Sequence, residues 1–320
     1  MGIVKIQKLY ESIKEKNFDI LGGKGAHLAK LLDLKMPVPS GFVLPTTCFK
    51  LFLEKSDYYQ RIQSILQNPI NFENILEVSK QLQDSIMHSK FPEKFLIEVE
   101  KAWEELSKHT KIEYVAVRSS ATVEDLETAS FAGQAETFLC IDNLDHLYKS
   151  IKDCWASLYS PRALMYCLTN NILVDKVQMA VIVQKMVNSD IAGVMFTADV
   201  VNKDPSKILI NITWGFGETI ADGKVDADEI LIDKDTLKIL NIRIGKKELM
   251  SIRNVNACGT RIIETPHNKR DCCCITEEKI IEIAKIGLEI EKKFKYYQDI
   301  EFAIENNEIK ILQSRPVTTM

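Results

Sequence analysis

The stretch from residue 114 to residue 134 combines a cation with small side chains in a pattern suited to phosphate binding. An apolar run at 114–117 leads directly into Arg118, and Ser-Ser-Ala-Thr at 119–122 and Ser-Phe-Ala-Gly-Gln at 130–134 follow. Arginine presents a planar fork of donors that matches phosphate oxygens, and small residues let backbone N–H groups approach the same oxygens. We therefore predict a strand that delivers Arg118 into a phosphate-binding loop. An ordinary surface loop is the alternative.

A second cation, Lys24, stands in the run Gly-Gly-Lys-Gly at 22–25, directly before apolar residues that recur at helical spacing, such as Leu28 and Leu31. A helix N-terminus and an ammonium group together attract phosphate. The spacing is not that of a P-loop. A plain glycine turn is the alternative.

Two segments near the C-terminus, 299–304 and 309–316, have the alternation of a β-hairpin and carry acidic, amide and basic side chains. Carboxylates at the end of a strand suit magnesium, which takes few protein oxygens and adds oxygens of substrate phosphates. An amphipathic edge hairpin with solvated charges is the alternative.

The register of this hairpin decides whether it can form a metal site. A two-residue loop at 306–307 would place Glu301 opposite Leu312, with Gln313 on the other face. A three-residue loop would place Glu301 opposite Gln313, with Arg315 on the same face, because side chains alternate with period two. We predict the second register and its three-residue loop.

Two more segments could contact a nucleotide. The residues Gln-Lys-Met-Val at 184–187 end an apolar strand that could hold an adenine, and the glycine-rich 214–218 could approach a ligand. A buried strand and a plain turn are the respective alternatives. The five histidines have no acid, cysteine or hydroxyl partner at a telling spacing, so none is predicted to be catalytic.

The elements that position these residues divide the chain into a helix-rich first part and a strand-rich second part, which we expect as domains 1–190 and 191–320. Helices are expected at 73–89, 93–108, 143–158 and 277–294, and strands at 178–187, 191–197, 207–213, 229–233 and 237–244. Helices mixed with largely consecutive strands predict the α+β class. The stretch 245–275 is expected to be the least regular.

Composition restricts the classes of function. The 320 residues carry a formal net charge of -4, and 46% are hydrophobic. Such a chain can bury a sizeable core in about two domains. The charge gives no reason to expect nucleic acid, and no apolar stretch is long enough for a membrane span. Most of the eight cysteines lie in apolar surroundings, and the run at 272–274 lacks zinc-ligand spacing, so we expect a cytoplasmic protein with reduced thiols.

Taken together, these segments resemble the N-terminal ATP-binding domain of the phosphoenolpyruvate synthase and pyruvate phosphate dikinase family. Rifamycin phosphotransferases and glucan-water dikinases share this domain type. The matching runs, in order, cover nearly the whole chain: Leu21-Gly-Gly-Lys-Gly-Ala26, Pro37-Val-Pro-Ser-Gly-Phe42, Val117-Arg-Ser-Ser-Ala-Thr122, Ser130-Phe-Ala-Gly-Gln134, Trp155-Ala-Ser-Leu158, Val183-Gln-Lys-Met-Val187, Gly193-Val-Met-Phe-Thr197, Trp214-Gly-Phe-Gly-Glu218, Gln298-Asp-Ile-Glu-Phe302 and Ile311-Leu-Gln-Ser-Arg-Pro316.

The resemblance implies an ATP-grasp fold, with ATP in the cleft between two α+β lobes, and it implies roles for nine residues. Phosphate contacts fall to Lys24, Arg118 and Arg315, and magnesium binding falls to Glu301 and Gln313. The implied catalytic residues are Lys24, Arg118, Asp299, Glu301 and Arg315. The remaining nucleotide-binding residues implied are Gly133 and Thr137 in the covering loop and Gln184 at the adenine hinge. ATP and Mg2+ are the implied cofactors.

The resemblance also implies unusual chemistry. In the family ATP is cleaved to AMP, and its β-phosphoryl group passes to a histidine on a swivelling domain and then to an acceptor such as pyruvate, an antibiotic or a glucan. This sequence carries no Thr-Ser-His acceptor motif. We expect the phosphohistidine domain and the acceptor domain to act in trans or to lie outside this sequence. A phosphoenolpyruvate-synthase-like role is the first choice; an antibiotic phosphotransferase domain and a non-catalytic ATP-sensing module are the alternatives.

Overall fold

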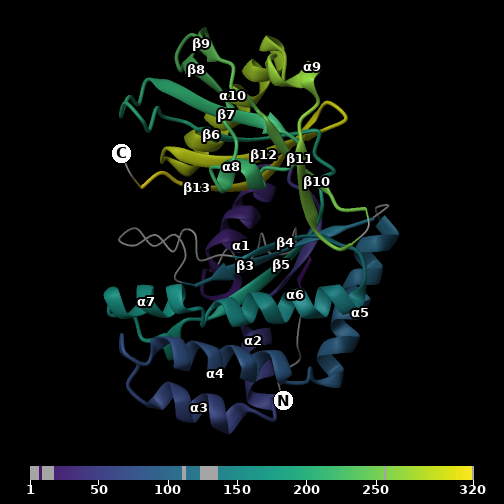
Figure 1. Cartoon of the computed structure of the whole chain (residues 1–320), viewed down its shortest axis with the longest axis vertical. Helices are drawn as coiled ribbons and strands as arrows, with labels where there is room; N and C mark the ends of the chain where they lie inside the picture. Colours follow the sequence, from purple (N-terminus) through teal and green to yellow (C-terminus); the bar gives the residue numbers. More distant parts are fainter. Residues whose placement is uncertain (1–6, 9–17, 110–112, 123–135, 256, 319–320) are drawn as a thin grey trace. The chain divides into compact units, whose positions relative to one another are not determined.

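The computed structural model describes residues 7–8, 18–109, 113–122, 136–255 and 257–318. The chain forms two compact units. Unit 1 comprises Met1–Lys30 and Ser40–Met186, and unit 2 comprises Leu31–Pro39 and Val187–Met320. Each unit is built around a sheet of its own (Figure 1).

The sheet of unit 1 is antiparallel and has the strand order β1-β2-β5-β3-β4. Its strands are β1 (Gln7–Lys8), β2 (Gly41–Leu44), β3 (Val115–Ala121), β4 (Thr137–Ile141) and β5 (Met179–Lys185). All seven residues of β3 are buried, because the strand is central and both of its faces are covered.

Most helices of unit 1 lie on one face of this sheet, with α6 next to it and α4 and α3 in successive layers beyond (Figure 1). The helices are α1 (Phe18–Asp33), α2 (Thr46–Lys55), α3 (Tyr59–Gln67), α4 (Ile75–His88), α5 (Glu93–His109), α6 (Leu144–Ser157) and α7 (Pro161–Thr169). Trp155 anchors the core between them. Its ring lies 5.4 Å from that of Phe49 and 4.7 Å from that of Phe52, within the range of favourable aromatic pairs.

The two faces of β3 have different neighbours. Val115, Val117 and Ala121 belong to the helix-covered core. Because side chains alternate along a strand, Arg118 and Ser120 project from the opposite face, where the Ser120 hydroxyl contacts the backbone of α1. This second face, which we call the α1 face, therefore carries the predicted phosphate-binding arginine.

Unit 2 is built on an antiparallel sheet with the order β13-β12-β6-β7-β8-β9. Its strands are β6 (Ile191–Phe196), β7 (Lys207–Trp214), β8 (Asp228–Asp233), β9 (Ile239–Arg243), β12 (Gln298–Glu305) and β13 (Glu308–Pro316). The helix α10 (Glu277–Phe294) covers one face. It approaches so closely that a Cβ on Gly287 would lie 2.4 Å from the terminal carbon of Met195.

The prediction of an irregular stretch at 245–275 is wrong. The strands β10 (Leu249–Arg253) and β11 (Thr260–Glu264) pair as an antiparallel hairpin, and α9 (His267–Arg270) follows. Two hydroxyls of this hairpin, those of Ser251 and Thr260, donate to one carboxylate oxygen of Glu218 in α8 (Glu218–Ala221), at 2.8 and 2.7 Å. Such long-range contacts are invisible in local sequence patterns.

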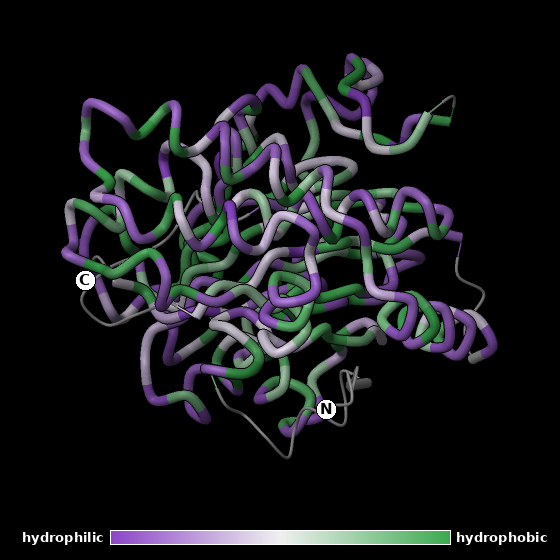
Figure 2. Tube along the Cα trace, turned by 90° about the horizontal axis from the view of Figure 1, so that it is seen from below, coloured by the Kyte–Doolittle hydropathy of each residue, from purple (hydrophilic) through white to green (hydrophobic). Residues whose placement is uncertain are grey.

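The predicted α+β class is confirmed by these two antiparallel sheets with their separate helices. The helix predicted at 277–294 has those bounds, whereas α2 and α3 were not predicted. None of the helices in the described part of the chain is long and apolar enough to cross a membrane. Hydrophobic and hydrophilic residues alternate along the trace (Figure 2).

Candidate functional site

The sequence predicts that a helix begins at the glycines around Lys24, but α1 begins earlier, at Phe18, and is kinked at Gly22. Gly22 has φ 68° and ψ 177°, which is not helical, and a side chain there would meet the backbone oxygen of Ser120 at 2.1 Å. Glycine is the residue that accepts both the positive φ and the close approach. Lys24 lies in the first turn after this kink and is buried, with 6% of its surface exposed.

Arg118 lies at the centre of the α1 face. Its backbone pairs with Thr137 on β4 and with Ile182 on β5. Directly paired residues point to the same side of a sheet, so the exposed Thr137 shares this face with the buried Arg118. Two of the predicted nucleotide-binding residues therefore meet on neighbouring strands.

One part of the sequence prediction for this segment is wrong. The strand continues past Arg118, because Ser119, Ser120 and Ala121 pair with Val181, Ala180 and Met179. The long apolar β5 offers backbone partners for the whole segment, and the small side chain of Ser120 fits beneath α1. Gly133 lies outside the described residues, as does most of the predicted covering loop.

Gln184, the predicted hinge residue, is on the same face. It pairs with Ala116 on β3 and with Gly41 on β2, and 2% of its surface is exposed. A side chain at Gly41 would lie 2.3 Å from the carbonyl oxygen of Val183. The glycine therefore lets β2 approach β5 closely beside Gln184.

The charge of Lys24 acts on the interior of unit 1. Burial raises the pKa of the Cys154 thiol well above its usual value, with smaller contributions from nearby carboxylates, and the positive charge of Lys24 opposes that rise. Cys154 lies on α6, on the helix-covered side of the sheet.

In unit 2 the predicted pairing of Glu301 with Gln313 is confirmed. The predicted three-residue loop is wrong. The turn has two residues, Asn306 and Asn307, whose φ values of 50° and 67° are typical of a type I′ hairpin turn. A bulge corrects the register: Phe302 pairs with Ile311 while Glu301 pairs with Gln313, so Leu312 is the extra residue.

The bulge reverses which face the end of β13 presents. Before it, Ile309 and Ile311 are buried opposite Ile304 and Phe302. Without an extra residue, strict alternation would send Gln313 and Arg315 into that same apolar side. Because Leu312 is inserted, Gln313 and Arg315 instead share a face with their partners across the hairpin.

This face is the one turned away from α10. Met195, which contacts α10, pairs with Ile300, so the neighbouring residues Asp299 and Glu301 point to the other side. Asp299 forms an ion pair with Arg315, whose Nε and Nη2 both lie 2.8 Å from one carboxylate oxygen. The arginine is thus held against the strand that carries Glu301.

Strand pairing also brings forward side chains that the sequence analysis missed. Glu301 pairs with Val194, Val194 with Asn211, and Asn211 with Glu229. Asn211 and Glu229 therefore share the face of Glu301. Only the register of four strands reveals this, since the residues are far apart in sequence.

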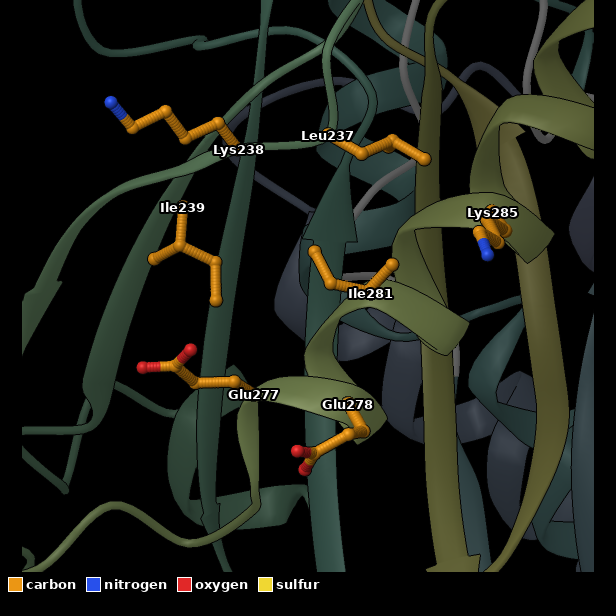
Figure 3. Close-up of a pocket in the computed structure, with 7 residues that line it drawn as sticks. All are labelled: Leu237, Lys238, Ile239, Glu277, Glu278, Ile281 and Lys285. Carbon is orange, nitrogen blue, oxygen red and sulfur yellow. The ribbon is translucent and has the colours of Figure 1, made fainter.

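A pocket of about 720 Å³ also lies in unit 2 (Figure 3). It is open and lies between α10 and the β8–β9 connection. Its lining is Leu237, Lys238, Ile239, Glu277, Glu278, Ile281 and Lys285. None of the predicted site residues is among them.

The sequence family described as "Pyruvate phosphate dikinase, AMP/ATP-binding domain" matches residues 18–320. Phosphoenolpyruvate synthase of Pyrococcus furiosus is 37% identical over an alignment of 356 residues including gaps. The alignment covers 98% of this chain and 44% of that protein. A probable phosphoenolpyruvate synthase of Methanocaldococcus jannaschii is 34% identical, over 97% of this chain and 26% of that protein.

Rifampicin phosphotransferase of Bacillus cereus is similar to nearly the same degree, with 33% identity over 97% of this chain and 36% of that protein. The chain thus spans less than half of the length of each of these relatives. Among solved structures, D-alanine–D-alanine ligase from Bacillus anthracis aligns with 94% of this chain at a TM-score of 0.36 and 9% identity.

Proposed function

This chain belongs to the pyruvate phosphate dikinase AMP/ATP-binding domain family, and on that premise we propose that it is the ATP-handling part of a dikinase-type phosphotransferase. It cleaves ATP to AMP and passes the β-phosphoryl group to a histidine on a swivelling domain. In a phosphoenolpyruvate-synthase-like system the full reaction converts pyruvate, ATP and water to phosphoenolpyruvate, AMP and phosphate.

One observation carries this proposal: the predicted site residues on each sheet lie on one face of that sheet. In unit 1, Arg118, Thr137 and Gln184 share the α1 face. In unit 2, Asp299, Glu301, Gln313 and Arg315 share the face away from α10.

The proposed roles follow from the chemistry of the side chains. Lys24 and Arg118 neutralise phosphate charge, and Gln184 borders the adenine. The residues Glu301 and Gln313 place a carboxylate and an amide oxygen side by side, which fits the hard oxygen ligands that Mg2+ prefers. Bound magnesium would neutralise the charge on the transferred phosphoryl group.

Arg315 has a defined orientation in this scheme. Asp299 accepts from its Nε and Nη2 side, so the guanidinium is fixed before a nucleotide binds. Phosphoryl transfer depends mainly on positioning and charge stabilisation, and a preset arginine provides both. The phosphoryl acceptor histidine belongs to a partner domain, as does the final acceptor site.

Two further assignments belong to this proposal. The lobes of the ATP-grasp fold are residues 1–190 and 191–320, and Gly133 and Thr137 contact the phosphates, Thr137 from the start of β4 rather than from a loop. The compartment is the cytoplasm, because Cys48, Cys154 and Cys167 are buried free thiols, as is usual in reducing compartments.

The test is transfer of label to a second polypeptide. The chain is incubated with source-cell extract and β-labelled ATP, with γ-labelled ATP as the control, and acid-labile label is followed. We expect label from the β position only, on a distinct protein, and none with Glu301→Ala. ATP binding without any β-label transfer would instead support the ATP-sensing alternative.

A rifampicin-phosphotransferase-type system is the second candidate, supported by the 33% identity to the Bacillus cereus enzyme. Both candidates share the step from ATP to phosphohistidine. Supplying pyruvate or rifampicin to the labelled partner separates them, since only the true acceptor removes the label.

A further inference from the structure

The hydroxyl of Ser120 is inserted into the helical hydrogen-bond ladder of α1. In an uninterrupted helix the N–H of Gly25 would donate to the carbonyl of Leu21, four residues earlier. Here the Gly25 N–H donates to Ser120 Oγ at 3.0 Å, and Ser120 Oγ donates to the Leu21 carbonyl oxygen at 2.8 Å. One distant side chain thus replaces the bond that the kink at Gly22 breaks.

The contact between Ser120 and α1 is fully buried and tightly packed. Ser120 has no exposed surface, and the absent Cβ of Gly22 would fall 2.4 Å from Ser120 Oγ and 2.1 Å from its backbone oxygen. A side chain that inserts into a helix ladder is a recognised cause of a kink. The glycine on α1 and the serine on β3 are therefore two halves of one contact.

Lys24 lies inside the turn that this contact closes, between Leu21 and Gly25. Arg118 lies two residues before Ser120 on β3, on the same face, at a strand separation of about 7 Å. A single hydroxyl therefore links the turn that carries the lysine to the strand that carries the arginine.

We propose that Ser120 is a positioning residue that holds Lys24 in register with Arg118, so that the two cations form one preassembled phosphate cradle. This inference rests on the proposed function, because it assumes that both cations bind ATP phosphates. Preassembly raises affinity, since groups that are already ordered lose less conformational freedom on binding.

The test compares ATP with adenosine on the full chain carrying Ser120→Ala. Adenosine has no phosphates and reports on the base and sugar contacts alone. We expect the dissociation constant for ATP to rise about tenfold, because the loss of both hydrogen bonds of the Ser120 hydroxyl frees the turn that carries Lys24. The dissociation constant for adenosine should stay unchanged.

Ser56→Ala is the matched control. Ser56 is also buried in unit 1, and its hydroxyl also makes two contacts, with the Tyr58 N–H at 2.9 Å and with Ser89 Oγ at 2.5 Å. It lies on the helix-covered side of the unit, at the end of α2. The two variants should lose comparable stability, but only Ser120→Ala should lose ATP affinity.

Three outcomes are distinguishable. Equal ATP affinity in Ser120→Ala and Ser56→Ala would overturn the inference, as would equal weakening of ATP and adenosine, which would indicate a general structural defect. Failure of the wild-type chain to bind ATP would overturn the proposed function together with this role. Should the alanine variant not fold, Ser120→Cys, which retains a weak donor and acceptor, is expected to give an intermediate ATP affinity and normal adenosine binding.

Discussion

The two groups of candidate site residues are assembled by opposite means. In unit 1 the turn that carries Lys24 is joined to the strand of Arg118 through a contact between residues 95 positions apart in sequence. In unit 2 the pairing of Glu301 with Gln313 lies within one hairpin, closed by a two-residue turn. One arrangement depends on tertiary packing, the other on local strand geometry.

This difference predicts which property each group loses when its residues are substituted. The phosphate cradle of Lys24 and Arg118 depends on the missing side chain of Gly22, because β3 occupies the space that a Cβ would need. The hairpin depends on the presence of one extra residue, Leu312, which turns Gln313 and Arg315 toward Glu301. Substitutions in the cradle should therefore reduce stability and affinity together, whereas substitutions of the proposed metal-binding side chains of the hairpin should affect catalysis and magnesium-dependent binding but not stability.

The largest effect is expected from Glu301→Gln. The substitution keeps the size of the side chain and its place on β12 but removes the negative charge. Transfer of β-label to the phosphohistidine partner should fall by about three orders of magnitude, as when one group that stabilises transition-state charge is lost. The folded state should be unaffected, because Glu301 is only partly buried.

Glu305→Gln is the control for that substitution. It lies on the same strand and the same face, near the turn, where its carboxylate accepts from the Asn188 N–H at 3.2 Å. Transfer at the wild-type rate is expected. If the two variants lost activity equally, general perturbation of the hairpin rather than the Glu301 charge would be responsible.

The next effect is on stability and concerns Gly22→Ala. An L-residue at positive φ costs about 1–2 kcal/mol, and the new Cβ would also meet the Ser120 backbone oxygen at 2.1 Å. We expect the free energy of unfolding to fall by about 3 kcal/mol or more, measured by denaturant titration.

Gly223→Ala is the control that separates the cost of the positive φ from the cost of the steric contact. Gly223 has φ +64°, and a Cβ there would meet nothing within 4 Å, so only the backbone cost of about 1–2 kcal/mol is expected. Equal losses in both variants would mean that α1 and β3 are not packed as tightly as the contact indicates.

The features that the sequence predicts correctly are the local ones, and those that depend on tertiary packing are missed. Alternation and helical spacing locate α10 and the hairpin of β12 and β13, because these signals are local. The pairing of Glu301 with Gln313 was predicted for the wrong reason, since turn length was assumed to be the sole determinant of register. A bulge is not evident in a pattern of side-chain types, so the role of Leu312 was missed.

The extension of β3 past Arg118 was missed for a different reason. Small polar residues such as Ser119 and Ser120 favour turns when they are considered alone. Their strand conformation comes from pairing with β5 and, for Ser120, from packing under α1. Such tertiary contacts override local preference, and the insertion of Ser120 into α1 could not have been inferred before the two segments were seen together.

Removing magnesium should separate the contributions of the cradle and of the hairpin to ATP affinity. With a chelator present, Glu301→Gln should bind ATP as the wild type does, because the proposed role of this carboxylate is to hold the metal. Ser120→Ala should remain weaker than the wild type by the same factor with or without magnesium, since separate sites are additive to within about 0.5 kcal/mol. Titration calorimetry with ATP under both conditions provides the measurement.

A dependence of the Ser120→Ala effect on magnesium would show that the two groups act as one. The inference of a preassembled cradle would then need revision, because the metal would be contributing to the position of Lys24.

The smallest effect is expected from Asn307→Gly in the hairpin turn. Asn307 has φ 67°, a conformation that glycine adopts without strain, and Asn-Gly is the preferred pair in this turn type. Stability should rise by about 0.5 kcal/mol, whereas Asn241→Gly, in the edge strand β9, should lower it by about the same amount. Transfer activity should not change in either variant, because Leu312 rather than the turn sets the register between Glu301 and Gln313. Loss of transfer in Asn307→Gly would instead make the turn the determinant of the register.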